Sequence, residues 1–104
     1  PAGPPVETVA VDQATGVQAT AGLVDHTWGM EIELSASGLE DGARYAVTVV
    51  GRDGRRHDSG SFLGTGAREL NCEMTSAVLR EDARAFAVRD AAGRVVIRAR
   101  LAAV

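Results

Sequence analysis

The chain has 104 residues, of which 45% are hydrophobic and 24% charged, and its formal net charge is −3 at pH 7. This length fits one domain, and the composition is too apolar for an intrinsically disordered segment. Because the eleven cationic residues are spread along an acidic chain without a cluster, we expect no nucleic acid among its partners.

The N-terminal residues Pro1–Pro5 predict an extended linker or stalk, since proline fixes φ and removes a backbone donor. A single domain is expected over residues 6–104. A start at Pro1 without methionine indicates a fragment or a processed product. No run of about 18 apolar residues is present, so we expect neither a membrane-spanning segment nor an export signal within these residues.

From Val6 onward, apolar residues recur with period two and turn residues interrupt them at short intervals. This pattern predicts strands at about residues 6–12, 17–24, 30–37, 44–50, 56–63, 69–75, 84–89 and 94–101. The expected fold is all-β: an antiparallel two-sheet β-sandwich, immunoglobulin-like, with seven to eight strands.

The third predicted strand has the clearest alternation. Its apolar residues from Met30 to Ala36 fall on one face, and Glu31, Glu33 and two serines fall on the other. We therefore expect one face of this strand in the core and the other in water.

Two turns and one loop are expected between the later strands. Asp53-Gly54 predicts a tight type I′ hairpin turn, and Gly93 suits the left-handed position of a longer loop that begins at Asp90. Residues 75–87 contain good helix formers but are too few for an independent helix, so we expect a crossing loop with about one helical turn.

The same alternation predicts which residues supply most of the core. Trp28, the only tryptophan, is interpreted as a core plug in preference to a ligand contact. The predicted core consists of Trp28, Ile32, Leu34, Leu39, Tyr45, Val47, Val49, Phe62, Leu70, Phe86, Val88, Val95 and Ile97.

Candidates for catalysis are few. His26 and His57 are possible bases, with Ser59, Ser61 or Cys72 as nucleophiles, but no Gly-x-Ser-x-Gly turn is present. We therefore expect no catalytic residues, and we retain the two histidines only as candidate ligand or partner contacts.

Metal and sugar chemistry have equally thin support. Asp25-His26 and His57-Asp58 are pairs of neighbours, and neighbouring strand residues point to opposite faces, so no metal or cofactor site is expected. Glu31 and Glu33 share a strand face in the manner of paired acids in glycoside hydrolysis, but a solvated outer face explains the two glutamates without any chemistry and is preferred.

Cys72 is the only cysteine, which excludes an internal disulfide and a multi-cysteine zinc site within the chain. It alternates with Leu70 and Met74, which predicts that the three share one face. The thiol is therefore interpreted as a small core side chain rather than a redox group.

Five segments form an ordered set of glycine turns and alternating strands. They are Trp28-Gly29-x-Glu31-Ile32-x-Leu34, Gly38-Leu39-x-x-Gly42-x-x-Tyr45-x-Val47, Asp53-Gly54-Arg55-Arg56, Gly60-Ser61-Phe62 and Val88-Arg89-Asp90-x-x-Gly93-Arg94-Val95. Over about residues 15–100, their order and spacing resemble the extracytoplasmic C-terminal domain of actinobacterial transmembrane anti-sigma factors.

The resemblance implies a β-sandwich on the outer face of the cell membrane, anchored by an upstream helix that is not in this chain. It also implies that proteolysis of the parent protein releases an extracytoplasmic-function sigma factor. The His-x-x-x-Cys-x-x-Cys zinc motif and the sigma-binding helices are absent here, so this chain alone is not expected to bind a sigma factor.

Two alternatives stay open. The segment from Leu39 to Val49 is similar to the leucine-to-tyrosine segment of fibronectin type III modules, in which the tyrosine hydroxyl bonds to nearby backbone at a sandwich corner. That likeness implies a secreted binding or spacer module. A small hydrolase that uses His57, or the Glu31 and Glu33 pair, is the other alternative. The sequence does not determine the oligomeric state.

Overall fold

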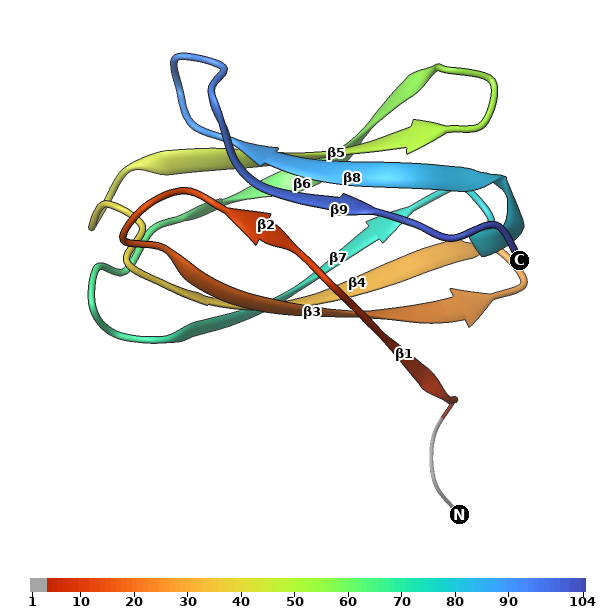
Figure 1. The fold of residues 1–104 in the computed structure, drawn as a ribbon, viewed down its shortest axis with the longest axis horizontal. Helices are drawn as coiled ribbons and strands as arrows, with labels where there is room; N and C mark the ends of the chain where they lie inside the picture. The colour runs from red at the N-terminus through yellow and green to blue at the C-terminus, as the bar shows by residue number, and fades with distance from the viewer. Residues whose placement is uncertain (1–3) are drawn as a thin grey trace.

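The computed structural model describes residues 4–104 as two antiparallel β-sheets that pack face to face (Figure 1). Sheet A has four strands in the order β1-β3-β4-β7. These strands are β1 (Val6–Val9), β3 (Gln18–His26), β4 (Gly29–Ser37) and β7 (Leu70–Ser76).

Sheet B has five strands in the order β2-β9-β8-β5-β6. They are β2 (Asp12–Gln13), β5 (Arg44–Gly51), β6 (Arg56–Leu63), β8 (Ala83–Arg89) and β9 (Val95–Arg100). A single 3₁₀ turn, η1 (Arg80–Asp82), lies in the connection from β7 to β8. The predicted antiparallel two-sheet sandwich is confirmed, as is the one helical turn expected within residues 75–87.

The strands lie within two residues of their predicted bounds, with one exception. The first predicted strand, at residues 6–12, divides into β1 in sheet A and β2 in sheet B, which brings the number of strands in the described residues to nine. In the immunoglobulin constant order the second and third strands lie in different sheets. If β1 and β2 together are counted as the first strand, the second and third strands here are β3 and β4, and they form a hairpin within sheet A. Of the predicted linker, Pro1–Gly3 lies outside the described residues, and the exposed Pro4 and Pro5 precede β1.

The hairpin at Asp53-Gly54 is present, but its predicted type I′ turn is wrong. Type I′ needs positive φ at both central residues, whereas among residues 4–104 only glycines have positive φ. Gly54 has φ 82° and donates its N–H to the carbonyl of Gly51, so the left-handed residue closes a longer loop. The side chain of Asp53 accepts the N–H of Arg55 at 2.9 Å, which stabilises this loop without positive φ at the aspartate.

The loop from Asp90 to Arg94 repeats this arrangement. Gly93 has φ 84° and donates its N–H to the carbonyl of Asp90, as expected for the left-handed position of a longer loop. The carboxylate of Asp90 accepts the backbone N–H groups of Ala92 and Arg94. These hydrogen bonds, with the guanidinium of Arg94, hold the pKa of Asp90 below its ordinary value.

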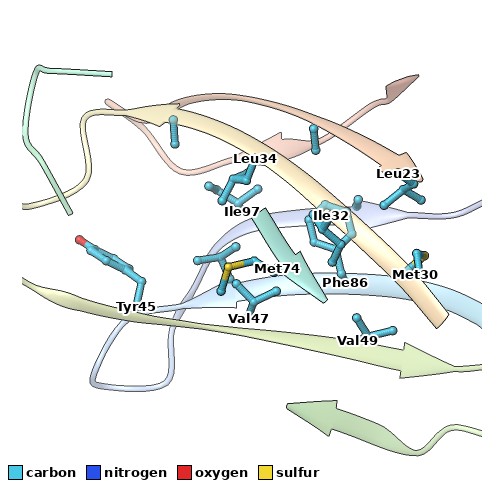
Figure 2. Packing of buried hydrophobic residues seen from close by; sticks show 14 of the residues in the cluster. Leu23, Met30, Ile32, Leu34, Tyr45, Val47, Val49, Met74, Phe86 and Ile97 are labelled. Atoms are coloured by element: carbon cyan, nitrogen blue, oxygen red, sulfur yellow. The ribbon is translucent and has the colours of Figure 1, made fainter. Parts of the chain in front are cut away.

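The core is the apolar layer between the sheets (Figure 2). Nine of the predicted core residues are buried, and Phe62, Leu70 and Val95 are partly buried. The alternation missed Leu23, which is only 1% exposed, because the run Gly22-Leu23-Val24 does not alternate. The nine buried residues are Ile32, Leu34, Leu39, Tyr45, Val47, Val49, Phe86, Val88 and Ile97.

Tyr45 holds the corner where the chain passes from β4 in sheet A to β5 in sheet B. Its ring is buried and stacks on Phe62 at a centroid distance of 5.8 Å. Its hydroxyl accepts the backbone N–H of Glu40 at 2.9 Å. The predicted bond from the tyrosine hydroxyl to nearby backbone is therefore confirmed.

Arg80 connects three segments that are far apart in the chain. It is only 3% exposed, although it is charged. Its Nε and Nη2 donate to the two carboxylate oxygens of Glu7 at 2.7 and 3.0 Å, and Nη2 also donates to the carbonyl of Ala102 at 2.9 Å. This clamp joins β1 and the C-terminal segment to η1. The hydrogen bonds from Arg80 lower the pKa of Glu7 below its ordinary value.

Replacing Tyr45 by Phe should lower the free energy of unfolding by about 1 kcal/mol, because the partly buried N–H of Glu40 loses its acceptor while the ring still fills its site. Urea denaturation followed by circular dichroism measures this change. Thr48→Ser, on the outer face of β5, is the control and should change stability by less than about 0.5 kcal/mol. An unchanged midpoint in Tyr45→Phe would show that the hydroxyl contributes nothing.

Replacing Glu7 by Gln should cost about 1–2 kcal/mol at pH 7, a range reduced because the Glu7 side chain is 42% exposed. Since the folded-state pKa of Glu7 is lowered, its contribution is present above its ordinary value of 4.5 and is lost as pH falls through the folded value. Urea denaturation of both proteins at pH 7 and near pH 3 should therefore show a difference that closes in acid. Glu69→Gln, an exposed glutamate, is the control; a gap that persists in acid would contradict the ion-pair explanation.

Candidate functional site

The outer face of sheet A brings together three of the residues that the sequence suggested for chemistry, namely His26, Glu31 and Glu33. The strand register places Glu31 of β4 opposite Thr75 of β7, and it places Glu33 opposite Glu73. His26, at the end of β3, pairs with Gly29. We use the name acidic-aromatic face for His26, Trp28, Glu31, Glu33 and Glu73.

A tight turn forms one end of this face. His26 and Gly29 pair across it, so only Thr27 and Trp28 lie between β3 and β4. Gly29 has φ 150°, and a Cβ built on it would lie 1.9 Å from the carbonyl oxygen of Ser76. Glycine is therefore required here, because any side chain would push β7 away from the start of β4.

Trp28 is not the core plug that the alternation predicts; that prediction is wrong. Its side chain is 54% exposed, and its ring stacks on His26 at a centroid distance of 4.4 Å and an interplanar angle of 10°. Trp28 lies two residues before Met30 and so has the same parity as the core residues Met30 and Ile32. However, β4 begins at Gly29, so Trp28 lies in the turn, where the strand period does not apply.

His26 links the aromatic stack to the acidic residues. Its Nε2 lies 3.0 Å from Oε1 of Glu31, and the two side chains are 21% and 19% exposed. Because an ionised carboxylate can only accept, Nε2 of His26 is the donor in this hydrogen bond. The result is a row of Trp28, His26 and Glu31 in which the imidazole is held on both sides.

Three carboxylates gather next to this row. Glu31, Glu33 and Glu73 each offer one oxygen within 4.8 Å of the others. Glu33 and Glu73 lie directly opposite each other on adjacent strands, an arrangement in which like charges repel. Oxygen donors at this spacing suit a positively charged ligand, either a hard metal ion or a guanidinium group.

The third acid comes from a part of the chain that the sequence did not connect with the pair. Glu73 lies forty residues after Glu33, and its only earlier signal was the alternation around Cys72. A shallow hollow of about 230 Å³ lies beside Glu33 and Glu73, lined also by Ser35 and Asn71. The acids therefore line an open sheet surface.

The structure does not bring the other candidates to this face. His57 is half-buried on β6 of sheet B, opposite Val49, and the hydroxyl of Ser59 is buried nearby. Asp25 pairs with Met30 and lies in the opposite phase from His26, as expected. The two histidines thus lie in different sheets and do not share a site.

Cys72 has the environment expected for a core side chain. It pairs with Leu34 on the inner side of sheet A, with Leu70 and Met74 in the same phase, and it packs against the core. Burial raises the pKa of its thiol above the ordinary value, which disfavours the reactive thiolate.

Comparisons with protein-family models, with curated proteins and with solved structures find no match to this chain. Within residues 4–104, none of the helical structure has the length and apolar character needed to cross a bilayer.

Replacing Trp28 by Ala should cost only about 1 kcal/mol of stability, because a half-exposed ring loses its stacking on His26 and little burial. Phe86→Ala, at a site that is fully buried, should cost about 3–5 kcal/mol and serves as the reference for a true core residue. Thermal and urea unfolding of both variants measure the difference. A loss above about 3 kcal/mol in Trp28→Ala would show that the ring supports the core after all.

Proposed function

We propose that this domain is the extracytoplasmic domain of a membrane-bound anti-sigma factor, and that it controls release of an extracytoplasmic-function sigma factor through proteolysis of the parent. The observation that supports this most is where the segments of the resemblance lie in the fold. Gly29 lies at the hairpin of the acidic-aromatic face, Tyr45 at the corner between sheets, and Gly54 and Gly93 at the hairpin loops of sheet B. Those segments thus form the turns and the corner that connect the strands of the sandwich.

In this proposal the domain acts as a folded gate and performs no catalysis. Strand β1 begins at Val6, directly after the predicted stalk, and it pairs with one neighbour only, β3. Most of β1 is exposed, so it depends on the clamp between Arg80 and Glu7. Opening the clamp frees β1 and lengthens the extended chain that a protease can reach.

The partners follow from the same assignment. The protease acts on the parent protein, and the sigma factor binds a cytoplasmic domain that this chain does not contain. The acidic-aromatic face, with its exposed Trp28, is the surface available for an outer partner. Exposed tryptophan is typical of residues that contribute strongly to protein contacts.

A secreted binding or spacer module of the fibronectin type is the second candidate. The bond between the N–H of Glu40 and the hydroxyl of Tyr45 favours it, because a tyrosine corner is a feature of such sandwiches. This alternative needs no protease and no membrane anchor.

The test has two parts: the sequence of the parent gene, and a substitution that breaks the clamp between Arg80 and Glu7. The gene should encode a span of about 20 apolar residues upstream of Pro1, preceded by the zinc motif. In the parent protein, Glu7→Gln should increase both cleavage near the stalk and transcription from a sigma-dependent reporter, while Glu69→Gln should change neither. A signal peptide directly before Pro1, or cleavage that is insensitive to Glu7→Gln, would refute the proposed gate.

A further inference from the structure

The outer face of sheet B carries five of the eleven arginines of the chain. Because opposed residues in a ladder share a face, the register aligns Arg98 with Ala87, Arg100 with Ala85, and Arg89 with Ala46. The same face holds two more arginines, from β5 and β6. We use the name arginine face for Arg44, Arg56, Arg89, Arg98 and Arg100.

These five arginines have no counterion within the described residues. The ion pairs found in residues 4–104 involve Arg55, Arg80, Arg94 and His26, and none of these belongs to the arginine face. Only two aspartates share the face, Asp12 opposite Arg98 and Asp58 opposite Thr48. The face therefore carries an excess of positive charge, although the whole chain is acidic.

The opposite face of the sandwich has the complementary charge. On the acidic-aromatic face, three carboxylates lie close together, and of these three only Glu31 contacts His26 through an ion pair. Neither Glu33 nor Glu73 has an ion-pair partner in the part of the chain described here. The described strands of sheet A contain no arginine that could neutralise these acids.

One molecule cannot bring its own two faces together. Figure 1 shows the sheets as two layers, with β5 and β8 in one and β3 and β4 in the other, so the charged faces point in opposite directions. A second copy, however, can present its arginine face to the acidic-aromatic face of the first. Small residues such as Ala46, Ala85 and Ala87 lie between the arginines, and their short side chains do not obstruct this approach.

We propose that the arginine face of one chain docks on the acidic-aromatic face of a second copy. Guanidinium groups from β9 would then pair with the carboxylates of Glu33 and Glu73, which relieves the repulsion between those two acids. Because the two surfaces are different, the contact is head-to-tail and can repeat along a stack. The proposal does not depend on the function proposed above.

The size of the surfaces predicts a weak association. Four strands at about 4.8 Å spacing and about 25 Å in length give on the order of 500 Å² per face, below the roughly 800 Å² per partner of a standard stable complex. Exposed ion pairs are individually weak and are screened by salt. We therefore expect association at high micromolar concentration and low ionic strength.

Sedimentation equilibrium of the chain between about 10 µM and 1 mM tests the proposal. In about 20 mM salt the average mass should rise with concentration above the 10.8 kDa of a monomer, and in about 0.5 M salt it should return to that value. A monomer throughout the low-salt series would overturn the proposal.

Neutralising variants of the two faces make the test specific. Arg98→Gln with Arg100→Gln removes charge from one face, and Glu33→Gln with Glu73→Gln removes it from the other. Each double variant should associate about tenfold more weakly than the wild type. An equimolar mixture should recover a one-to-one dimer, since each variant keeps one intact face, and this dimer should not grow further.

Arg55→Gln with Arg94→Gln is the matched control, because both side chains lie at hairpin loops and are more than 80% exposed. It removes the same charge and should associate like the wild type. Equal weakening by this control, or a mixture that stays monomeric, would contradict the docking of the two faces. Binding to anionic lipid vesicles by a chain that remains monomeric would assign the arginine face to a membrane surface and likewise overturn the proposal.

Discussion

Burial of the inner face of each sheet against the other is the interaction on which the rest of this domain depends. The largest fully buried side chains come from both layers, with Leu23, Ile32 and Leu34 on sheet A and Phe86 and Ile97 on sheet B (Figure 2). A slip of one residue in any strand would move its apolar set to water. The core therefore fixes the register, and the register determines which polar side chains share each outer face.

The two charged faces are a consequence of that register. Glu33 and Glu73 meet because β4 and β7 pair at the positions that bury Ile32 against Met74 and Leu34 against Cys72. Repulsion between the two acids costs on the order of 0.2–1 kcal/mol, whereas burial of one large apolar side chain contributes about 1.5–3 kcal/mol. The core thus tolerates an unfavourable surface pair, and that pair then favours an external cation.

The β1 edge of sheet A is held to the rest of the fold by few contacts. Strand β1 has four residues, mostly exposed, and pairs with one strand only. Its charged contact joins Glu7 to Arg80, which lies 73 residues later in the sequence. A buried arginine that loses its carboxylate is costly, so β1 and the clamp form or open together. The gate proposed for this domain relies on that coupling.

Much of the fold could be predicted from the sequence, and some of the candidate site could not. Period-two alternation depends only on neighbouring residues, so it located every strand after the first within two residues and correctly placed Ile32, Leu34 and Val47 in the core. The same rule failed for Trp28, because its side chain lies in a two-residue turn and stacks on His26 outside the core. The alternation correctly placed Glu31 and Glu33 on one strand face. It did not predict that Glu73 lies beside them, which turns the pair into a cluster of three carboxylates.

What the sequence determined by itself is therefore local: strand positions, the glycine-dependent loops at Gly54 and Gly93, and the hydroxyl bond of Tyr45 to backbone five residues away. Only the tertiary structure decided the approach of Glu73 to Glu33, the pairing of Arg80 with Glu7 and the gathering of arginines on one sheet. The physical reason is distance along the chain. Strand alternation specifies the face of each side chain, but which strands become neighbours is set by packing of the whole core.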